Sequence, residues 1–293
     1  MGAVEETRSA VRVLVTGSAG QLGSDVADRL RAAGDEVIGV DRSQLDIVVC
    51  EDVELLVAQV QPDVVINCAA FTAVDRCETE VDLAYDVNHY GVRVLAEACG
   101  RSGSHLVHVS TDYVFDGTLK RPYQEDDATS PQSVYGRSKL KGERAATEIL
   151  GDACTIVRTS WVCGEQGNNM VKLVRRLAAS GKPMSFVDDQ RGCPTFTADL
   201  APALRTLALD RPGGIFHLTN AGPVSWYAFV REILAVSGDD PHLVTPIATS
   251  ELDPPRPAPR PANSVLANAR WVAEGRLPLR DFRAPLAELV ARL

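Results

Sequence analysis

Tyr135 and Lys139 are the residues in this sequence whose types and spacing most clearly permit chemistry. If their segment is helical, a spacing of four places both side chains on one face. An ammonium near a phenol favours the phenolate, so the pair predicts a tyrosine with a lowered pKa that exchanges a proton with a carbonyl oxygen. Such a pair is often an ordinary surface pair, but here Ser110 and Thr111 end a buried strand shortly before it. We therefore interpret Thr111, Tyr135 and Lys139 as a catalytic set.

A glycine-rich turn provides the second chemical signal. The segment Thr16-Gly17-Ser-Ala-Gly20-Gln-Leu-Gly23 follows an apolar strand and opens a helix. Glycines allow a tight turn and close approach to a pyrophosphate, whose charge is stabilised by the N–H groups at the helix start. Because no Gly-Lys-Ser/Thr ending follows, a nucleoside-triphosphate P-loop is excluded. The turn predicts dinucleotide contacts from Gly17, Ala19, Gly20, Gln21 and Leu22.

Asp41 and Arg42 end the next strand, at the place where a dinucleotide cofactor is selected. A carboxylate there binds the ribose hydroxyls of NADH, and a cation binds the 2′-phosphate of NADPH. Both are present, so the sequence leaves NADPH and NADH open. Asp46 and Ile47 are predicted to bracket the adenine, although Asp46 is equally well explained as a helix N-cap.

The elements that position these residues alternate between short apolar strands and helices. The strands are expected at 11–15, 36–40, 63–67, 105–109 and 154–158, with helices near 22–33, 51–60, 80–101 and 134–149. This order predicts an α/β fold, a Rossmann-type doubly wound parallel sheet with a smaller C-terminal substrate-binding lobe. The NAD(P)-binding domain is expected over 1–160, with chain returning at about 183–222, and residues 161–293 are expected to form mainly the lobe.

Composition narrows the partners. The chain has 293 residues, 45% of them hydrophobic, and a net charge of −9 without a basic cluster, which argues against nucleic-acid or anionic-membrane binding. No apolar stretch is long enough to span a membrane, and Glu5 and Glu6 stand where a signal peptide would be basic or apolar, so a cytoplasmic location is expected. Seven scattered cysteines predict reduced, mostly buried thiols.

Further motifs extend over nearly the whole chain. They are Asn67-Cys-Ala-Ala70, Asn88, Ser110-Thr-Asp-Tyr-Val-Phe-Asp-Gly117, Arg158-Thr-Ser-Trp-Val162, Gly167-Asn-Asn169, Asp188-Asp-Gln-Arg-Gly-Cys-Pro-Thr195 and Arg260-Pro-Ala-Asn-Ser-Val-Leu266. With the glycine-rich turn and the Tyr135/Lys139 pair, they resemble the extended short-chain dehydrogenases/reductases. Within that superfamily, the chain resembles the dTDP-4-dehydrorhamnose reductase family, which implies NAD(P)H-dependent reduction of a dTDP-4-keto-6-deoxy sugar.

The resemblance also implies residue roles. Tyr135 would protonate the sugar C4 oxygen, Lys139 would tune Tyr135 and hold the nicotinamide ribose, and Thr111 would hydrogen-bond the substrate carbonyl. Asn88 matches a position that supports a proton-relay water, and Arg260 is a candidate diphosphate clamp. Further cofactor contacts are expected from Cys68, Ala69, Ala70 and Asn88. Substrate contacts are expected from Thr72, Val74, Asp112, Tyr113, Trp161, Asn169, Gln190, Pro194 and Arg260.

Three residues depart from the family pattern near the expected sugar pocket: Phe71, Cys163 and Met170. They leave open a related reductase of antibiotic deoxysugar biosynthesis, such as a dTDP-dihydrostreptose synthase. A non-catalytic regulatory subunit is a second alternative, because the family includes one for methionine adenosyltransferase. Epimerases and dehydratases share the Tyr/Lys pair, and Asp112 nominally occupies the acidic position that a dehydratase needs.

Oligomeric state and metal binding also follow from the resemblance. Some family members are described as metal-bridged dimers, and the matching positions here are Asp25, Ala198 and Glu288. Alanine cannot ligate a cation, so the sequence predicts no bridging Mg²⁺ at this set. We expect a monomer or a weak homodimer, and sedimentation with and without a chelator tests this expectation.

Overall fold

The structure, a computed structural model, describes residues 10–293. Its centre is a six-stranded parallel sheet in the order β2-β1-β3-β4-β5-β10. Their apolar, largely buried sequences are typical of parallel strands covered on both faces. The predicted doubly wound α/β fold is confirmed. The strands are β1 (Arg12–Thr16), β2 (Glu36–Val40), β3 (Val64–Asn67), β4 (His105–Thr111), β5 (Cys154–Thr159) and β10 (Gly214–His217).

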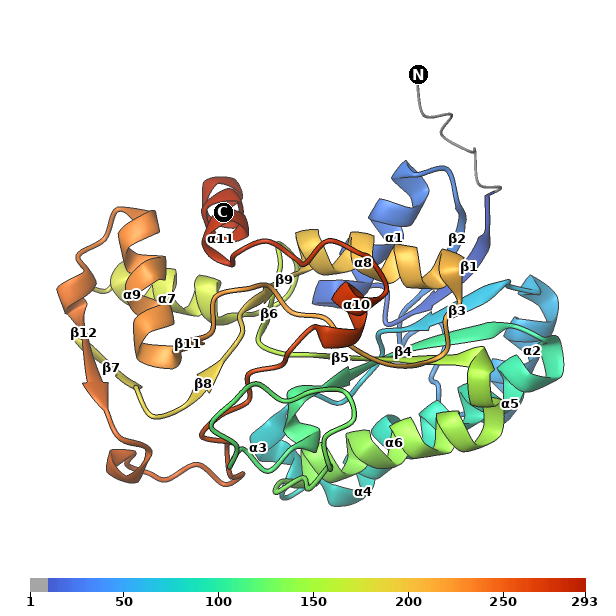
Figure 1. Cartoon of the computed structure of the whole chain (residues 1–293), viewed down its shortest axis with the longest axis horizontal. Coiled ribbons are helices and arrows are strands. Elements are labelled where there is room, and N and C mark those ends of the chain that lie inside the picture. The colour runs from blue at the N-terminus through green and yellow to red at the C-terminus, as the bar shows by residue number, and fades with distance from the viewer. Residues whose placement is uncertain (1–9) are drawn as a thin grey trace.

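Helices cover both faces of this sheet (Figure 1). On one face α1 packs beside α8, and on the other α2, α5 and α6 lie side by side. Each face buries its own apolar cluster against the sheet. These helices are α1 (Gln21–Ala32), α2 (Cys50–Val60), α5 (Gly91–Ser102), α6 (Val134–Leu150) and α8 (Thr197–Asp210), with the short α3 (Val74–Cys77) and α4 (Val81–Tyr85) beside α6.

A smaller lobe with its own apolar core stands beside the sheet (Figure 1). It contains three two-stranded pairs, β6 with β9, β7 with β12 and β8 with β11. The chain was expected to return to the NAD(P)-binding domain at about 183–222. It returns to the large sheet through α8 and β10, whereas β7 stays in the lobe. The division near residue 160 stays a prediction. The remaining elements are β6 (Val162–Cys163), α7 (Met170–Ala178), β7 (Met184–Val187), β8 (Arg191–Gly192), β9 (Thr195–Phe196), β11 (Val224–Ser225), α9 (Trp226–Ser237), β12 (Val244–Ile247), α10 (Ala269–Ala273) and α11 (Arg283–Arg292).

The helix expected over 80–101 is present, but it contains a π-helical turn that the sequence did not predict. Between α4 and α5, residues Asp86–Tyr90 form a π-helical turn. The wider turn carries Asn88 inward, where its side chain accepts from the Phe71 N–H at 2.8 Å and donates to the Phe71 carbonyl at 3.0 Å. Gly142 of α6 permits this arrangement, because a Cβ there would lie 2.2 Å from the Asn88 carbonyl oxygen. Such single π turns often occur at functional sites.

Two compositional expectations can be compared with the structure. All seven cysteines are free and five of them are buried, as predicted. No helix within residues 10–293 combines the length and hydropathy needed to cross a membrane. Glu5 and Glu6, which argued against a signal peptide, lie outside the described residues.

Candidate active site

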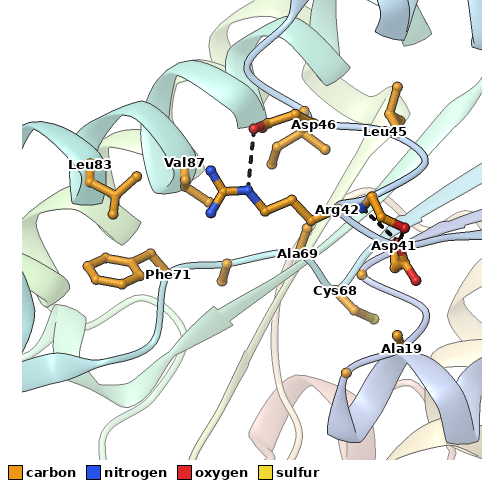
Figure 2. Close-up of a pocket in the computed structure, with 15 residues that line it drawn as sticks. Ala19, Asp41, Arg42, Leu45, Asp46, Cys68, Ala69, Phe71, Leu83 and Val87 are labelled. Atoms are coloured by element: carbon orange, nitrogen blue, oxygen red, sulfur yellow. Dashed lines mark hydrogen bonds and ion pairs between the residues drawn. The ribbon is translucent and has the colours of Figure 1, made fainter.

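A cavity of about 430 Å³ opens at the carboxyl ends of β1, β2 and β3 (Figure 2). This is where ligands bind in open α/β sheets. Most of its lining comes from the turns that follow the three strands, and Leu83 and Val87 add to it from α4 and the π turn. Of the predicted cofactor residues, the lining includes Gly17, Ala19, Gly20, Asp41, Arg42, Asp46, Ile47, Cys68, Ala69 and Ala70.

The turn after β1 is built for close backbone approach. Gly17 has φ +69°, and a Cβ there would lie 2.8 Å from the Ala69 backbone nitrogen. A Cβ on Gly23 would lie 2.2 Å from the Gly17 carbonyl oxygen, so only glycine lets α1 start here. Within the described chain, the first turn of α1 has neither a side-chain cap nor an acidic residue. Its N–H groups therefore suit a pyrophosphate, and the residues present fit a dinucleotide.

Asp41 and Arg42 lie on the rim of the cavity. Asp41 accepts from the Ser43 hydroxyl at 2.6 Å and the Ser43 N–H at 2.8 Å, and these bonds lower the pKa of its carboxyl. Arg42 extends across the cavity toward Asp46, with 3.4 Å between Nε and the carboxylate oxygen (Figure 2). The Arg42 side chain is 74% exposed, so this weak pair leaves its guanidinium accessible to an anion.

Four further lining residues escaped the sequence interpretation: Ser43, Leu45, Leu83 and Val87. Phe71, which the sequence analysis noted only as a departure from the family pattern, lines the cavity as well. Phe71, Leu83 and Val87 form an apolar wall around the guanidinium of Arg42 (Figure 2). Leu83 and Val87 are four residues apart, which is a helical spacing, so a signal for them was present in the sequence.

Gln21 and Asn169 point away from the lining and join the two parts of the molecule. The Gln21 carboxamide donates to the Val162 carbonyl at 2.9 Å and accepts from Asn169 Nδ2 at 2.7 Å. Asn169 also caps α7, accepting from the Lys172 N–H at 3.2 Å. In this structure, both side chains are used to hold the lobe against the glycine-rich turn.

The start of α6 brings Tyr135 to the end of β4. Ser133 caps the helix, accepting from the Gly136 N–H at 3.1 Å. A Cβ on Gly136 would lie 2.2 Å from the Tyr113 carbonyl oxygen, so this glycine allows α6 to pack closely on the turn after Thr111. The Tyr135 phenol lies near the Thr111 hydroxyl, and its ring meets the Tyr113 ring edge-on with centroids 5.5 Å apart. The structure thus unites the predicted Thr111 and Tyr135.

The electrostatics of the pair correct the sequence interpretation. Burial raises the pKa of the Tyr135 phenol above its usual range instead of lowering it, with the nearby Thr111 hydroxyl acting in the opposite direction. Burial lowers the pKa of Lys139 to about 8, although the carboxylate of Glu143 opposes this shift. Lys139 Nζ donates to the Val109 carbonyl at 2.8 Å. Their spacing in the sequence places both residues on one helix face. It does not show how deeply they are buried, and burial disfavours the charged form of each and so shifts both pKa values.

Asp112 is a buried carboxyl immediately beside this pair. Its Oδ1 accepts from the Thr111 hydroxyl at 2.9 Å, while Oδ2 has no hydrogen-bond partner among the described residues. Burial raises its pKa to about 6, and the hydrogen bond from Thr111 opposes this shift. An unpartnered buried oxygen is a place where a substrate hydroxyl can donate.

The Tyr135 ring belongs to an apolar cluster that includes Cys77 and Ala84 and packs against Phe71 and Val74. Since Phe71 also lines the cavity, the cluster links the predicted proton donor to the dinucleotide side of the cleft. The predicted substrate residue Thr72 is exposed beside it. Val74 begins α3.

Arg260 reaches the same region from the C-terminal part of the chain. It donates two hydrogen bonds to Asp75, at 2.7 and 2.8 Å. Burial and Asp112 raise the pKa of Tyr113 to about 12, and Arg260 and Arg256 oppose this shift, which places both positive charges near that tyrosine. The predicted diphosphate clamp therefore already has a carboxylate partner, Asp75, which the sequence interpretation missed.

On the lobe side, Trp161 is stacked on Trp226, with ring centroids 3.5 Å apart. Trp161 has φ +47°, and Gly192 makes room for its ring, since a Cβ there would lie 2.5 Å from Trp161 Cε2. Gln190 is buried and donates to the Thr249 hydroxyl at 2.9 Å, and its Oε1 lacks a partner within residues 10–293. Pro194 is buried. Trp226 was not foreseen.

Comparison with known proteins identifies the family. Residues 11–293 match the family model described as the RmlD substrate binding domain. The chain is 46% identical to a dTDP-4-dehydrorhamnose reductase of Streptomyces griseus over 94% of this chain and 92% of the relative. It belongs to this family. A crystal structure of dTDP-4-dehydrorhamnose reductase from Bacillus anthracis in complex with NADP has 34% identity and a TM-score of 0.92, covering 97% of this chain and 100% of that one. A dTDP-4-keto-6-deoxy-D-glucose reductase of Streptomyces niveus is 40% identical over 94% of this chain and 96% of the relative.

The three positions that the sequence analysis matched to metal ligands by resemblance meet in a separate hollow. Asp25, Ala198 and Glu288 all line it. Asp25 accepts from the Thr197 hydroxyl, and Glu288 is paired with Arg280 at 2.5 Å. Within residues 10–293, no group of three or more His, Cys, Asp or Glu side chains is arranged to hold a metal ion. The absence of bridging Mg²⁺ and the oligomeric state stay predictions.

Proposed function

We propose that this chain is an NAD(P)H-dependent reductase of the 4-keto group of a dTDP-4-dehydro-6-deoxy sugar, converting dTDP-4-dehydrorhamnose to dTDP-L-rhamnose in the cytoplasm. The observation that carries the proposal is the buried contact between Thr111 and Tyr135, beside Lys139 and next to a cleft that fits a dinucleotide. Membership of a family whose relatives bear this activity in their names supports the substrate class.

The proposed mechanism assigns a task to each group. When bound, the reduced nicotinamide supplies the hydride. Tyr135 donates its phenolic proton to the sugar C4 oxygen, and burial favours its protonated form until that oxygen becomes basic. Thr111 orients the carbonyl, while the unpartnered Oδ2 of Asp112 accepts a hydrogen bond from the sugar. The apolar cluster that contains Tyr135, against which Phe71 packs, helps to exclude water.

We expect the dinucleotide cleft to bind either NADPH or NADH, with Arg42 favouring NADPH. Arg42→Ala should weaken NADPH binding by roughly ten- to a hundredfold and leave NADH binding nearly unchanged, because NADPH alone carries the 2′-phosphate. Titration calorimetry with both cofactors measures this difference. Arg93→Ala is the matched control, since Arg93 is an exposed arginine paired with Glu97 on α5. Equal losses for both cofactors in Arg42→Ala would contradict the assignment.

An antibiotic-sugar reductase is the second candidate, and Phe71 is the observation that favours it. This departure from the family pattern lines the cavity and packs on the Tyr135 cluster. Cys163, by contrast, is buried in the lobe core, and Met170 begins α7 and packs against that core. The relative from Streptomyces niveus is named as a reductase of a different 4-keto sugar.

A panel of dTDP-4-keto-6-deoxy sugars separates the candidates. We expect oxidation of NAD(P)H with the L-lyxo-4-hexulose, the rhamnose precursor, and a single configuration at C4 of the product. Turnover of a modified sugar alone would assign the chain to antibiotic biosynthesis. Tight dinucleotide binding without oxidation by any sugar would favour the regulatory-subunit alternative.

A further inference from the structure

A row of buried polar side chains crosses the centre of the sheet and ends at Lys139. Thr16, Asn67 and His108 are direct cross-strand neighbours on β1, β3 and β4. Thr16 Oγ1 donates to Asn67 Oδ1 at 2.7 Å, Asn67 Nδ2 lies 3.0 Å from His108 Nδ1, and His108 Nε2 lies 3.3 Å from Lys139 Nζ. All four residues are at most 2% exposed. At such burial, every donor must meet an acceptor.

The hydrogen bonds of Asn67 determine which nitrogen of His108 carries the proton. Asn67 Oδ1 accepts from the Ala69 backbone N–H at 3.0 Å, and this obligatory donor fixes the orientation of the amide. Asn67 Nδ2 must then be the donor to His108 Nδ1, which is therefore unprotonated. Complete burial keeps the pKa of His108 well below its usual range, so the ring is neutral. The remaining proton is on Nε2.

The Nε2–H group of His108 points at Lys139 Nζ. An ammonium offers hydrogens only, so it would oppose this N–H, whereas a neutral amine accepts from it through its lone pair. The amine still donates one hydrogen to the Val109 carbonyl. We propose that His108 is a positioning residue that favours the neutral amine of Lys139 over its ammonium, because the Nε2–H group can donate a hydrogen bond to Nζ only in the amine form.

The other groups around Lys139 determine how readily its amine gains a proton. Burial disfavours the ammonium and lowers the pKa of Lys139 to about 8, whereas the carboxylate of Glu143, on the same helix, favours the ammonium. The Cys68 thiol, after β3, is uncharged near neutral pH because burial raises its pKa to about 12. An amine balanced in this way changes charge near neutral pH. Only the ammonium stabilises the Tyr135 phenolate, so a change of charge on Lys139 near neutral pH makes the acidity of the Tyr135 phenol depend on pH. The role of that phenol as the proton donor, unlike the hydrogen-bond assignment itself, rests on the proposed reductase function.

The experiment observes the imidazole and the amine directly. The chain has five histidines and five lysines, so long-range ¹H–¹⁵N spectra of labelled protein should be simple. We expect the His108 ring to be the neutral Nε2–H form throughout pH 6–9, and the Lys139 amine to titrate near pH 8. An Nδ1–H ring, or a Lys139 pKa near the usual value of about 10.4, overturns the proposal.

Asn67→Asp tests the link between the two residues. A carboxylate keeps the bond from Ala69 but can accept a proton from Nδ1, so the His108 ring should switch to the Nδ1–H form. We expect the Lys139 pKa to rise by about one unit or more, because Nε2 then accepts from the ammonium. The same substitution in a His108→Phe background measures the effect of the added charge alone. Equal shifts in both backgrounds contradict the proposal.

The first test needs only the wild-type protein, whose signals can be assigned sequentially. It therefore does not depend on whether any variant folds. Failure of the sugar panel leaves the ring form and amine pKa unaffected. Conversely, a wrong ring form leaves the proposed reductase function intact, so the two failures are distinguishable.

Discussion

Tyr135→Phe should reduce turnover by about two to four powers of ten while cofactor affinity persists. The substitution removes the phenolic proton, which we propose is transferred to C4, and keeps the ring that packs on Tyr113 and the cluster around Cys77. NAD(P)H oxidation measures the loss, and titration calorimetry measures the cofactor affinity.

Tyr85→Phe is the matched control for this prediction. Tyr85 packs against the same apolar cluster as Tyr135. We place it outside the catalytic set, so removing its hydroxyl should leave the rate within a small factor. A Tyr135→Phe protein with wild-type turnover would show that another group supplies the proton. Equal rate losses in the two variants would indicate a general packing effect.

The agreement between sequence and structure is best where a pattern has one physical explanation. Short apolar strands between helices can bury both faces only in a parallel sheet, so the fold was predictable. The glycine-rich turn was also predictable, because Gly17 and Gly23 occupy positions where any Cβ meets backbone. Asp41 and Arg42 follow β2 and therefore had to lie at the carboxyl edge with that turn.

The disagreements arise where the outcome depends on long-range contacts. Arg260 carries a charge suited to a diphosphate, but its pairing with Asp75 joins residues 185 positions apart. Gln21 is held by residues of the lobe. The pKa of Tyr135 depends on how deeply α6 packs onto the turn after β4, which spacing within one helix does not encode. Sequence patterns thus placed these residues near the site without determining their partners.

A buried ion pair connects the catalytic helix to the sheet and provides the largest expected effect on stability. Arg158 of β5 donates to Glu143 of α6 at 2.7 Å, and the two side chains are only 3% and 4% exposed. Ser110 adds a hydrogen bond to the same carboxylate at 2.5 Å. Glu143 lies one turn after Lys139, so the pair fixes the position of α6 against the strand that ends at Thr111.

Arg158→Met should lower the free energy of unfolding by about 3–5 kcal/mol, because it leaves the Glu143 carboxylate buried without a counter-charge. Urea unfolding followed by circular dichroism measures this. The double variant Glu143→Leu/Arg158→Met is the control, since replacing both charges with apolar groups of similar size is often close to neutral. If the double variant is as unstable as Arg158→Met, lost packing is the cause and the ion-pair explanation is wrong.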